Sequence, residues 1–306
     1  ALTDKADGRK YLTFFDGTKS YFPDRLPKKV EYDFNPADKK DQYARLYSDT
    51  VVDTINGLNL PRYGLANYIN PKPTIKLTKE EEVIIANLSR AGRRLKGFCR
   101  TNLFKRLESS GYSFLLSLSR HILRNFVFVY AIQNKLPIPI GKNIVENLDG
   151  FIEDRDTDDE NEDNTITFFT DEEEYLRSAK KVYTLFEKKY NTRFDWIRSE
   201  LFISDLKNEL INDGREIIKI LKIVKEWDPD EDRQLNALFK LINTTHNKDK
   251  LLIFTQFADT AYYLYAQLKK KGVKGLDCVT GDSENPTHYA YRFSPVSNEK
   301  PELKGT

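Results

Sequence analysis

The chain has 306 residues, of which 39% are hydrophobic and 12% aromatic, and its 49 basic and 47 acidic side chains give a formal net charge of +2. This length and apolar content predict a globular protein with a sizeable core and two units rather than one. No apolar run approaches the length of a membrane-spanning helix, and the N-terminal residues ALTDKADGRK lack the core of a signal peptide, so we expect a cytoplasmic protein with no membrane partner.

Two cysteines bear on the compartment and on metal binding. Cys99 and Cys278 lie far apart and show no CxxC or Cys/His spacing. This usage fits a reducing compartment and argues against a disulfide framework or a zinc site. We therefore expect no metal-binding residues in this chain.

The first predicted element is a half-exposed strand over residues 30–34, VEYDF, in which apolar and charged side chains alternate. We expect residues 1–35 to form a lead-in strand region. A helix is then predicted to start at Asn35-Pro36, because asparagine is a favoured N-cap and proline suits the first helical position.

Residues 36–227 are predicted to form a helical region. Thr78 and Glu81 match the capping box T-x-x-E, which opens a helix with an apolar face. The run from Tyr112 to Ile132 is apolar on nearly every side, so it predicts a helix at the centre of a helical core. Two further helices are predicted after it, over residues 174–190 and 194–227.

Residues 149–174 are strongly acidic and contain one basic residue, Arg155. We expect a mobile, solvated surface segment. Calcium binding is disfavoured, because DRDTDDENEDN lacks the central glycine and the terminal glutamate of an EF-hand loop.

The most informative stretch is residues 247–283, where the pattern predicts a βαβ unit. The apolar run 251–254 is too short for a helix and predicts a strand that is buried on both faces. A helix with an N-cap at Asp259 or Thr260 and a left-handed C-cap at Gly272 should follow. Its apolar stripe would comprise Ala261, Leu264, Tyr265 and Leu268, and a second strand would comprise residues 276–280.

The ends of these two predicted strands carry polar residues and a glycine. In open parallel sheets, ligands bind at the carboxyl ends of the strands, and a glycine lets a backbone amide approach a phosphate closely. The candidate ligand-binding residues at these strand ends are therefore Thr255, Gln256, Thr280 and Gly281. On the pattern alone, an ordinary polar strand-to-helix turn is the favoured interpretation.

A second candidate DNA-binding group lies between Arg90 and Arg106, where seven basic residues occur with no acidic one. Such cations could contact phosphates. They could equally form a solvated helix face that balances the acidic segment within the chain. The candidates carried forward from this group are Arg93, Arg94, Lys105 and Arg106.

Several runs occur in an order typical of one protein family. They are LPKK (26–29), QYARLY (42–47), FKRLESS (104–110), KLLIFTQFADTAYYL (250–264), VTGD (279–282) and YRFSP (291–295). In these runs, over roughly residues 22–110 and 231–296, the chain resembles the Snf2 branch of the superfamily 2 helicase-like ATPases. It is most similar to bacterial members, namely the RNA-polymerase-associated Snf2 ATPase and the helicases of restriction and phage-defence loci.

The resemblance implies an α/β fold, with a partial RecA-like parallel sheet and a large helical insertion or subdomain. LLIFTQF resembles motif IV, so residues 228–306 would be the N-terminal part of a second RecA-like lobe, truncated before motif V. In such a lobe the DNA backbone lies across the strand ends, so the resemblance implies DNA contacts at Thr255, Gln256, Thr280 and Gly281. The intact protein would be an ATP-dependent DNA translocase that uses ATP and Mg²⁺. Its partners would be duplex DNA, its own first RecA-like lobe and other subunits of a restriction, defence or transcription complex.

Three motifs that such an ATPase needs are missing from the sequence. There is no GxxxxGK[ST] loop to hold phosphates, no DEAH-like run to hold magnesium and no QxxGRxxR pattern to supply an arginine finger. We therefore predict that this chain contains no catalytic residues, binds no nucleotide cofactor alone and does not turn over ATP. The alternative is a non-catalytic helical module for protein interaction in a DNA-processing or defence complex.

Overall fold

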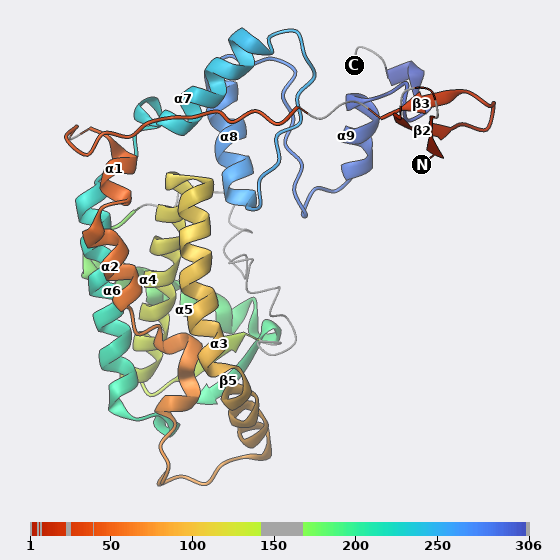
Figure 1. Ribbon diagram of the computed structural model, residues 1–306. Helices are drawn as coiled ribbons and strands as arrows, with labels where there is room; N and C mark the ends of the chain where they lie inside the picture. Colours follow the sequence, from red (N-terminus) through yellow and green to blue (C-terminus); the bar gives the residue numbers. More distant parts are fainter. Residues whose placement is uncertain are drawn as a thin grey trace. The chain divides into compact units, whose positions relative to one another are not determined.

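The computed structural model describes residues 2–4, 6, 8–22, 26–38, 40–141 and 168–303. The chain forms two units, residues 1–32 and residues 33–306 (Figure 1). The end of the acidic segment, which was predicted to be a loop, is partly helical, because Asp171 is the N-cap of a helix. The rest of that segment, up to residue 167, lies outside the described residues.

The first unit contains a three-stranded antiparallel sheet in the order β1-β2-β3. Its strands are β1 (Leu2–Thr3), β2 (Lys10–Thr13) and β3 (Lys19–Tyr21). Tyr11 lies opposite both Leu2 and Tyr21 in the register. The strands of this unit therefore lie earlier in the chain than the strand that was predicted over residues 30–34.

The strand predicted over residues 30–34 is wrong, because these residues have no partner strand and no regular structure. An alternating pattern becomes a strand only where a neighbouring strand satisfies its backbone groups. The helix predicted at Asn35-Pro36 also starts later. Asn35 instead accepts a hydrogen bond from the backbone amide of Ala37 in a turn, and α1 (Gln42–Leu46) begins after the N-cap Asp41.

The second unit contains a group of helices that surround α4. Helix α4 packs against α3, α5 and α6, and a 3₁₀ segment at Pro61–Tyr68 packs against α3 and α6. Figure 1 shows these helices side by side. The helices are α2 (Asp49–Gly57), α3 (Lys79–Ser109), α4 (Gly111–Gln133), α5 (Glu172–Lys188) and α6 (Ser204–Val224).

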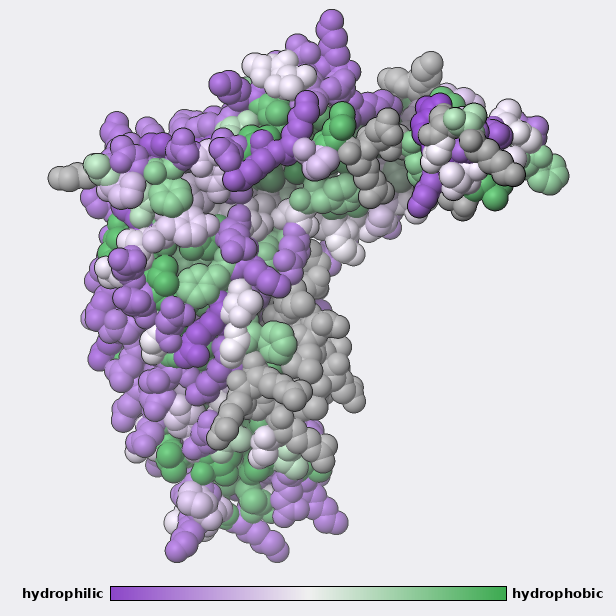
Figure 2. All heavy atoms as spheres, in the orientation of Figure 1, coloured by the Kyte–Doolittle hydropathy of each residue, from purple (hydrophilic) through white to green (hydrophobic). Residues whose placement is uncertain are grey.

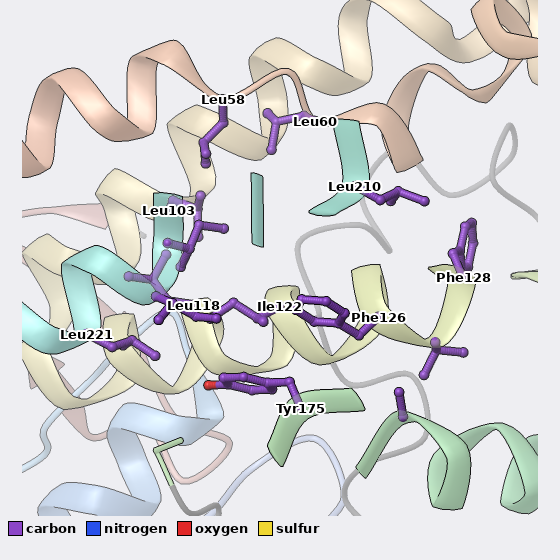
Figure 3. Packing of buried hydrophobic residues seen from close by; sticks show 14 of the residues in the cluster. Leu58, Leu60, Leu103, Leu118, Ile122, Phe126, Phe128, Tyr175, Leu210 and Leu221 are labelled. Carbon is purple, nitrogen blue, oxygen red and sulfur yellow. The ribbon is translucent and has the colours of Figure 1, made fainter. Parts of the chain in front are cut away.

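Helix α4 occupies the centre of this core, as its apolar sequence predicted. Phe114, Leu118, Ile122 and Phe126 are fully buried along it. Figure 3 shows Leu118, Ile122 and Phe126 packed among residues of the surrounding helices. In Figure 2 most of the visible described surface is hydrophilic, which is expected where helices bury one face and expose the other.

Local capping signals set the ends of α3 and α4. The predicted capping box is confirmed: the Thr78 hydroxyl accepts from the Glu81 amide at 3.2 Å, and the Glu81 carboxylate accepts from the Thr78 amide at 2.9 Å. Hydrogen bonds from Arg198 lower the pKa of the Glu81 carboxyl. Ser110 ends α3 as its C-cap and starts α4 as its N-cap, so one residue joins the two helices.

A two-stranded antiparallel sheet joins β4 (Pro137–Gly141) to β5 (Phe194–Arg198), with Ile138 opposite Ile197. The helix predicted over residues 194–227 is therefore wrong at its start, and α6 begins only at Ser204. Residues 194–198 form a strand because β4 pairs with their backbone and because Ile197 becomes fully buried.

The C-terminal part of the second unit carries α7 (Arg233–Lys240), a π-helical turn at Leu241–Thr245, α8 (Ala258–Lys270) and α9 (Pro286–Phe293). The fold is thus mixed α/β, with antiparallel sheets in the described residues. Residues 251–254 and 276–280 are not paired as strands. Leu252, Ile253 and Phe254 are 64%, 44% and 88% exposed. The prediction that this run is buried is therefore wrong, because no strand covers it in the described structure.

Helix α8 differs from its prediction in detail. Its N-cap is Phe257 rather than Asp259 or Thr260, and its buried residues are Thr260, Tyr263 and Leu268. Ala261, Leu264 and Tyr265, which were predicted to form the buried stripe, are only partly buried, because the face of α8 that meets α4 is a different one. The C-terminal prediction is confirmed: Gly272 has a φ of +86° and its amide donates to the carbonyl of Lys269.

The first residue of α4, Gly111, is packed too tightly to accept a side chain. A Cβ atom there would lie 2.6 Å from Cζ3 of Trp227 and 2.9 Å from Cδ1 of Leu46. We expect Gly111→Ala to lower the free energy of unfolding by about 1–3 kcal/mol, measured by urea denaturation. Gly97→Ala in α3 is the control, because nothing lies within 4 Å of its Cβ position; equal losses in both variants would contradict the packing argument.

Candidate functional site

A cavity of about 300 Å³ lies at the N-terminal end of α8. Five of the residues predicted to bind DNA line it, namely Thr255, Gln256, Thr280, Gly281 and Arg106. The first four come from the two predicted strand ends, and Arg106 comes from α3, far away in the sequence. The structure therefore brings together residues from both predicted groups.

Two segments, residues 250–256 and 276–281, run in the same direction and end at this cavity. At their starts, Lys250 donates to the carbonyl of Phe293 at 2.6 Å and Asp277 pairs with Arg292 at 3.0 Å, so both starts are held by α9. At their ends, Thr255 and Thr280 line the same cavity. The segments thus have the relative direction of a βαβ unit, although they form no ladder.

Beneath the cavity, two arginines converge on one carboxylate. Arg106 of α3 donates to Asp259 at 2.8 Å, and Arg120 of α4 donates to both carboxylate oxygens of Asp259 at 2.7 and 3.2 Å. The side chains are 4%, 7% and 15% exposed, respectively. The guanidinium of Arg106 also lies over the ring of Phe257, 4.7 Å from its centroid. Asp259 therefore ties α8 to both α3 and α4.

A group of hydroxyls supports the same junction. Ser109 Oγ lies 3.1 Å from Thr255 Oγ1 and 2.9 Å from Thr260 Oγ1, and Ser113 Oγ lies 3.0 Å from Thr260 Oγ1. The Tyr262 hydroxyl, on α8, lies 2.8 Å from Thr280 Oγ1. Thr255 and Thr280 are thus held in place at the cavity from two sides.

One turn further along the same face, α8 is fixed by a buried polar network. Trp227 Nε1 donates to the Tyr263 hydroxyl at 2.9 Å, and this hydroxyl donates to Asp232 at 2.7 Å. The other carboxylate oxygen of Asp232 accepts from the amide of Leu235 and so caps α7. Burial raises the pKa of the Asp232 carboxyl. These bonds give α8 a defined position beside the cavity.

The remaining predicted residues are placed differently. Lys105 is exposed on α3 and does not line the cavity. Arg93 and Arg94 belong to α3, but their side chains lie outside the described residues. Arg106 is nearly fully buried, so any contact that it makes with a ligand must occur inside the cavity.

Sequence reasoning missed Arg120 and Asp259 as site residues. One signal was available: Arg120 interrupts the apolar sequence of α4, and a cation at a buried position requires an anionic partner. No local pattern identified that partner, because Asp259 lies 139 residues further along the chain.

Comparison of the chain with protein-family models, with curated proteins and with solved structures finds no match. Within the described ranges, no group of three or more His, Cys, Asp and Glu residues is arranged to hold a metal ion. None of the helices in those ranges is both long and apolar enough to cross a membrane. The side chains of Cys99 and Cys278 are both half-buried.

Proposed function

We propose that this chain is part of an ATP-dependent DNA translocase of the Snf2 type, and that the cavity at α8 grips the backbone of duplex DNA. The observation that carries the proposal is the convergence of Thr255, Gln256, Thr280, Gly281 and Arg106 on one cavity. The family resemblance implies a DNA contact at the ends of the same two segments. Polar side chains and a glycine backbone are suitable donors to phosphate oxygens.

In this proposal, residues 251–254 and 276–280 belong to the parallel sheet of a second RecA-like lobe. Their common direction and the intervening helix α8 support that assignment. The exposed side chains of Leu252, Ile253 and Phe254 would be covered by further strands of the lobe. ATP and Mg²⁺ would bind at the first lobe, and closure of the interlobe cleft would move the gripped DNA.

A second candidate function, protein interaction, is favoured by the same exposed run. Along residues 251–254, no backbone amide or carbonyl in the described structure takes part in a hydrogen bond. Exposed apolar side chains on an unpaired extended backbone favour the addition of a β-strand from a partner. In this alternative the chain is a non-catalytic module of a DNA-processing or defence complex.

DNA binding distinguishes the two functions. We expect the chain to bind duplex DNA of arbitrary sequence, with an affinity that falls as the salt concentration rises. Gln256→Glu should lower that affinity about tenfold at low salt, because it places a negative charge at the mouth of the cavity beside the phosphate. Fluorescence anisotropy with a labelled duplex measures the effect.

The matched control is Gln133→Glu, which makes the same chemical change at an exposed residue. Gln133 is the last residue of α4, whereas Ser113, which contacts α8, lies near the start of that helix. Equal effects of the two substitutions would contradict a DNA contact at the cavity. An absence of DNA binding by the chain would leave the protein-interaction function as the better one.

A further inference from the structure

A chain of hydroxyl groups connects the helical core to the rim of the cavity. Ser113 Oγ of α4 lies 3.0 Å from Thr260 Oγ1 of α8, and Thr260 Oγ1 lies 2.9 Å from Ser109 Oγ of α3. Ser109 Oγ lies 3.1 Å from Thr255 Oγ1, and Thr255 lines the cavity. A hydroxyl has one hydrogen to donate and two lone pairs with which to accept, so each of these contacts has a direction.

Burial fixes the direction at the inner end of the chain. Ser113 is fully buried, and among the described residues Thr260 Oγ1 is the hydrogen-bond partner of its hydroxyl. A buried donor that lacks an acceptor is costly, so Ser113 donates to Thr260. Thr260 is only 2% exposed, and its own hydrogen therefore goes to Ser109, the other hydroxyl that it contacts.

The same count makes Ser109 the donor to Thr255. With Ser109 accepting from Thr260, the reverse direction would leave the Ser109 hydrogen without an acceptor in the described part of the chain. A hydroxyl that accepts a hydrogen bond also becomes a better donor, which favours one direction throughout. Thr255 Oγ1 accepts a second hydrogen bond, from the amide of Phe257 at 3.4 Å. Both lone pairs of Thr255 are then occupied, and only its hydrogen is left for a ligand.

Thr280, which also lines the cavity, is under no such constraint. Its Oγ1 lies 2.8 Å from the hydroxyl of Tyr262, a residue that is 47% exposed. Water can therefore supply or accept hydrogen bonds at the Tyr262 hydroxyl, and Thr280 can act as donor or as acceptor. The two threonines thus differ in what they offer to a ligand.

We infer that Thr255 is a specificity-determining residue, a hydrogen-bond donor of fixed direction that selects ligand oxygens without a hydrogen of their own. Ser109, Thr260 and Ser113 are the positioning residues that fix this direction. The inference rests on the proposed function for its ligand, the DNA backbone, whose non-bridging phosphate oxygens can only accept. A ligand that presents an N–H or O–H group at this point would face the Thr255 hydrogen and would be rejected.

The direct test follows the hydroxyl hydrogens of the wild-type chain by NMR, with ¹³C-labelled threonine. In the free chain, we expect the Thr260 hydrogen to be protected from exchange with water and the Thr255 hydrogen to exchange quickly. A short DNA duplex should slow exchange at Thr255 about tenfold or more, because a phosphate oxygen then accepts this hydrogen. A Thr255 hydrogen that is already protected in the free chain would overturn the inference, since it would be donated to Ser109.

The second test measures the affinity for the duplex by fluorescence anisotropy. Thr255→Val removes the hydroxyl at nearly constant shape and should weaken binding about tenfold, whereas Thr255→Ser should recover most of the affinity. Ser109→Ala should weaken binding about threefold, because it removes the donor that orients Thr255. Ser89→Ala, at an exposed serine of the same helix, is the matched control and should bind as the wild type does.

A double-mutant cycle separates positioning from a general loss of structure. If Ser109 acts through Thr255, Ser109→Ala should cause no further loss of duplex binding in the Thr255→Val background. Equal losses in the wild-type and Thr255→Val backgrounds would contradict the positioning role, because they would show that Ser109 acts independently of Thr255.

The remaining outcomes separate the inference from the proposed function. If Gln256→Glu weakens duplex binding and Thr255→Val does not, the inference fails and the DNA contact stands. If the chain does not bind the duplex, the proposed function fails, and exchange of the Thr255 and Thr260 hydrogens in the free chain still decides whether the donor is fixed. That measurement also decides if Thr255→Val does not fold, because it uses the wild-type chain.

Discussion

Replacement of Asp259 by alanine is expected to lower the free energy of unfolding by about 3–5 kcal/mol, because it removes an anion that two buried cations share. Asp259 accepts hydrogen bonds from Arg106 at 2.8 Å and from Arg120 at 2.7 and 3.2 Å. Both arginines are almost completely buried, so water cannot replace the lost carboxylate. Urea denaturation followed by circular dichroism measures the loss.

The control for this experiment is Asp277→Ala, which removes an ion pair of another kind. Asp277 pairs with Arg292 at 3.0 Å, but the two side chains are 46% and 35% exposed. An exposed pair of this kind contributes about 0–1 kcal/mol. A loss in Asp259→Ala no larger than in Asp277→Ala would show that the arginine pair tolerates the absence of its carboxylate.

Phe126→Ala is the second substitution with a large expected effect, again a loss of about 3–5 kcal/mol in the free energy of unfolding. Phe126 is fully buried near the middle of α4, and its ring stacks on Tyr175 of α5 with centroids 6.2 Å apart. The ring also lies against the backbone of Gly214 in α6. Its removal would leave a cavity among three helices, and differential scanning calorimetry or urea denaturation measures the cost.

Phe98→Ala provides the matched control on the surface of α3. Phe98 is 54% exposed, so the same truncation should change the free energy of unfolding by no more than about 0.5 kcal/mol. Comparable losses for Phe98 and Phe126 would contradict the position of the core around α4.

The helices of the second unit were largely predictable, since their signals are local. The capping box at Thr78 and Glu81 fixes the start of α3 within four residues of chain. The apolar sequence from Tyr112 to Ile132 predicts α4 and its central position without any information about its partners. Patterns of this kind repeat within a few helical turns, so they predict a helix without knowledge of its tertiary contacts.

The strands were harder to predict, because their formation depends on distant partners. Residues 194–198 look compatible with a helix until β4, at residues 137–141, pairs with them. The opposite failure occurs at residues 251–254, whose apolar sequence suggests a buried strand but which have no pairing strand in the described structure. In both cases the deciding contacts are non-local, and sequence periodicity does not contain them.

The candidate site divides in the same way. Thr255, Gln256, Thr280 and Gly281 could be chosen in advance, because the ends of successive parallel strands lie near each other. The charged interior could not be predicted from the sequence, since Asp259 of α8 lies 153 positions from Arg106 of α3 and 139 positions from Arg120 of α4. The basic run from Arg90 to Arg106 pointed to the correct helix, but burial rather than exposure determines how Arg106 can act.

Ser110, the residue shared by the ends of α3 and α4, also bears on the order in which the site forms. Arg106 and Arg120 lie on either side of this corner and only a few turns from it, so short-range contacts are sufficient to bring them together. Contacts between residues close in sequence form faster than those that close long loops. During synthesis and folding, the two arginines would therefore lie close together before Asp259 reaches them, and α8 would dock onto a corner that α3 and α4 have already formed.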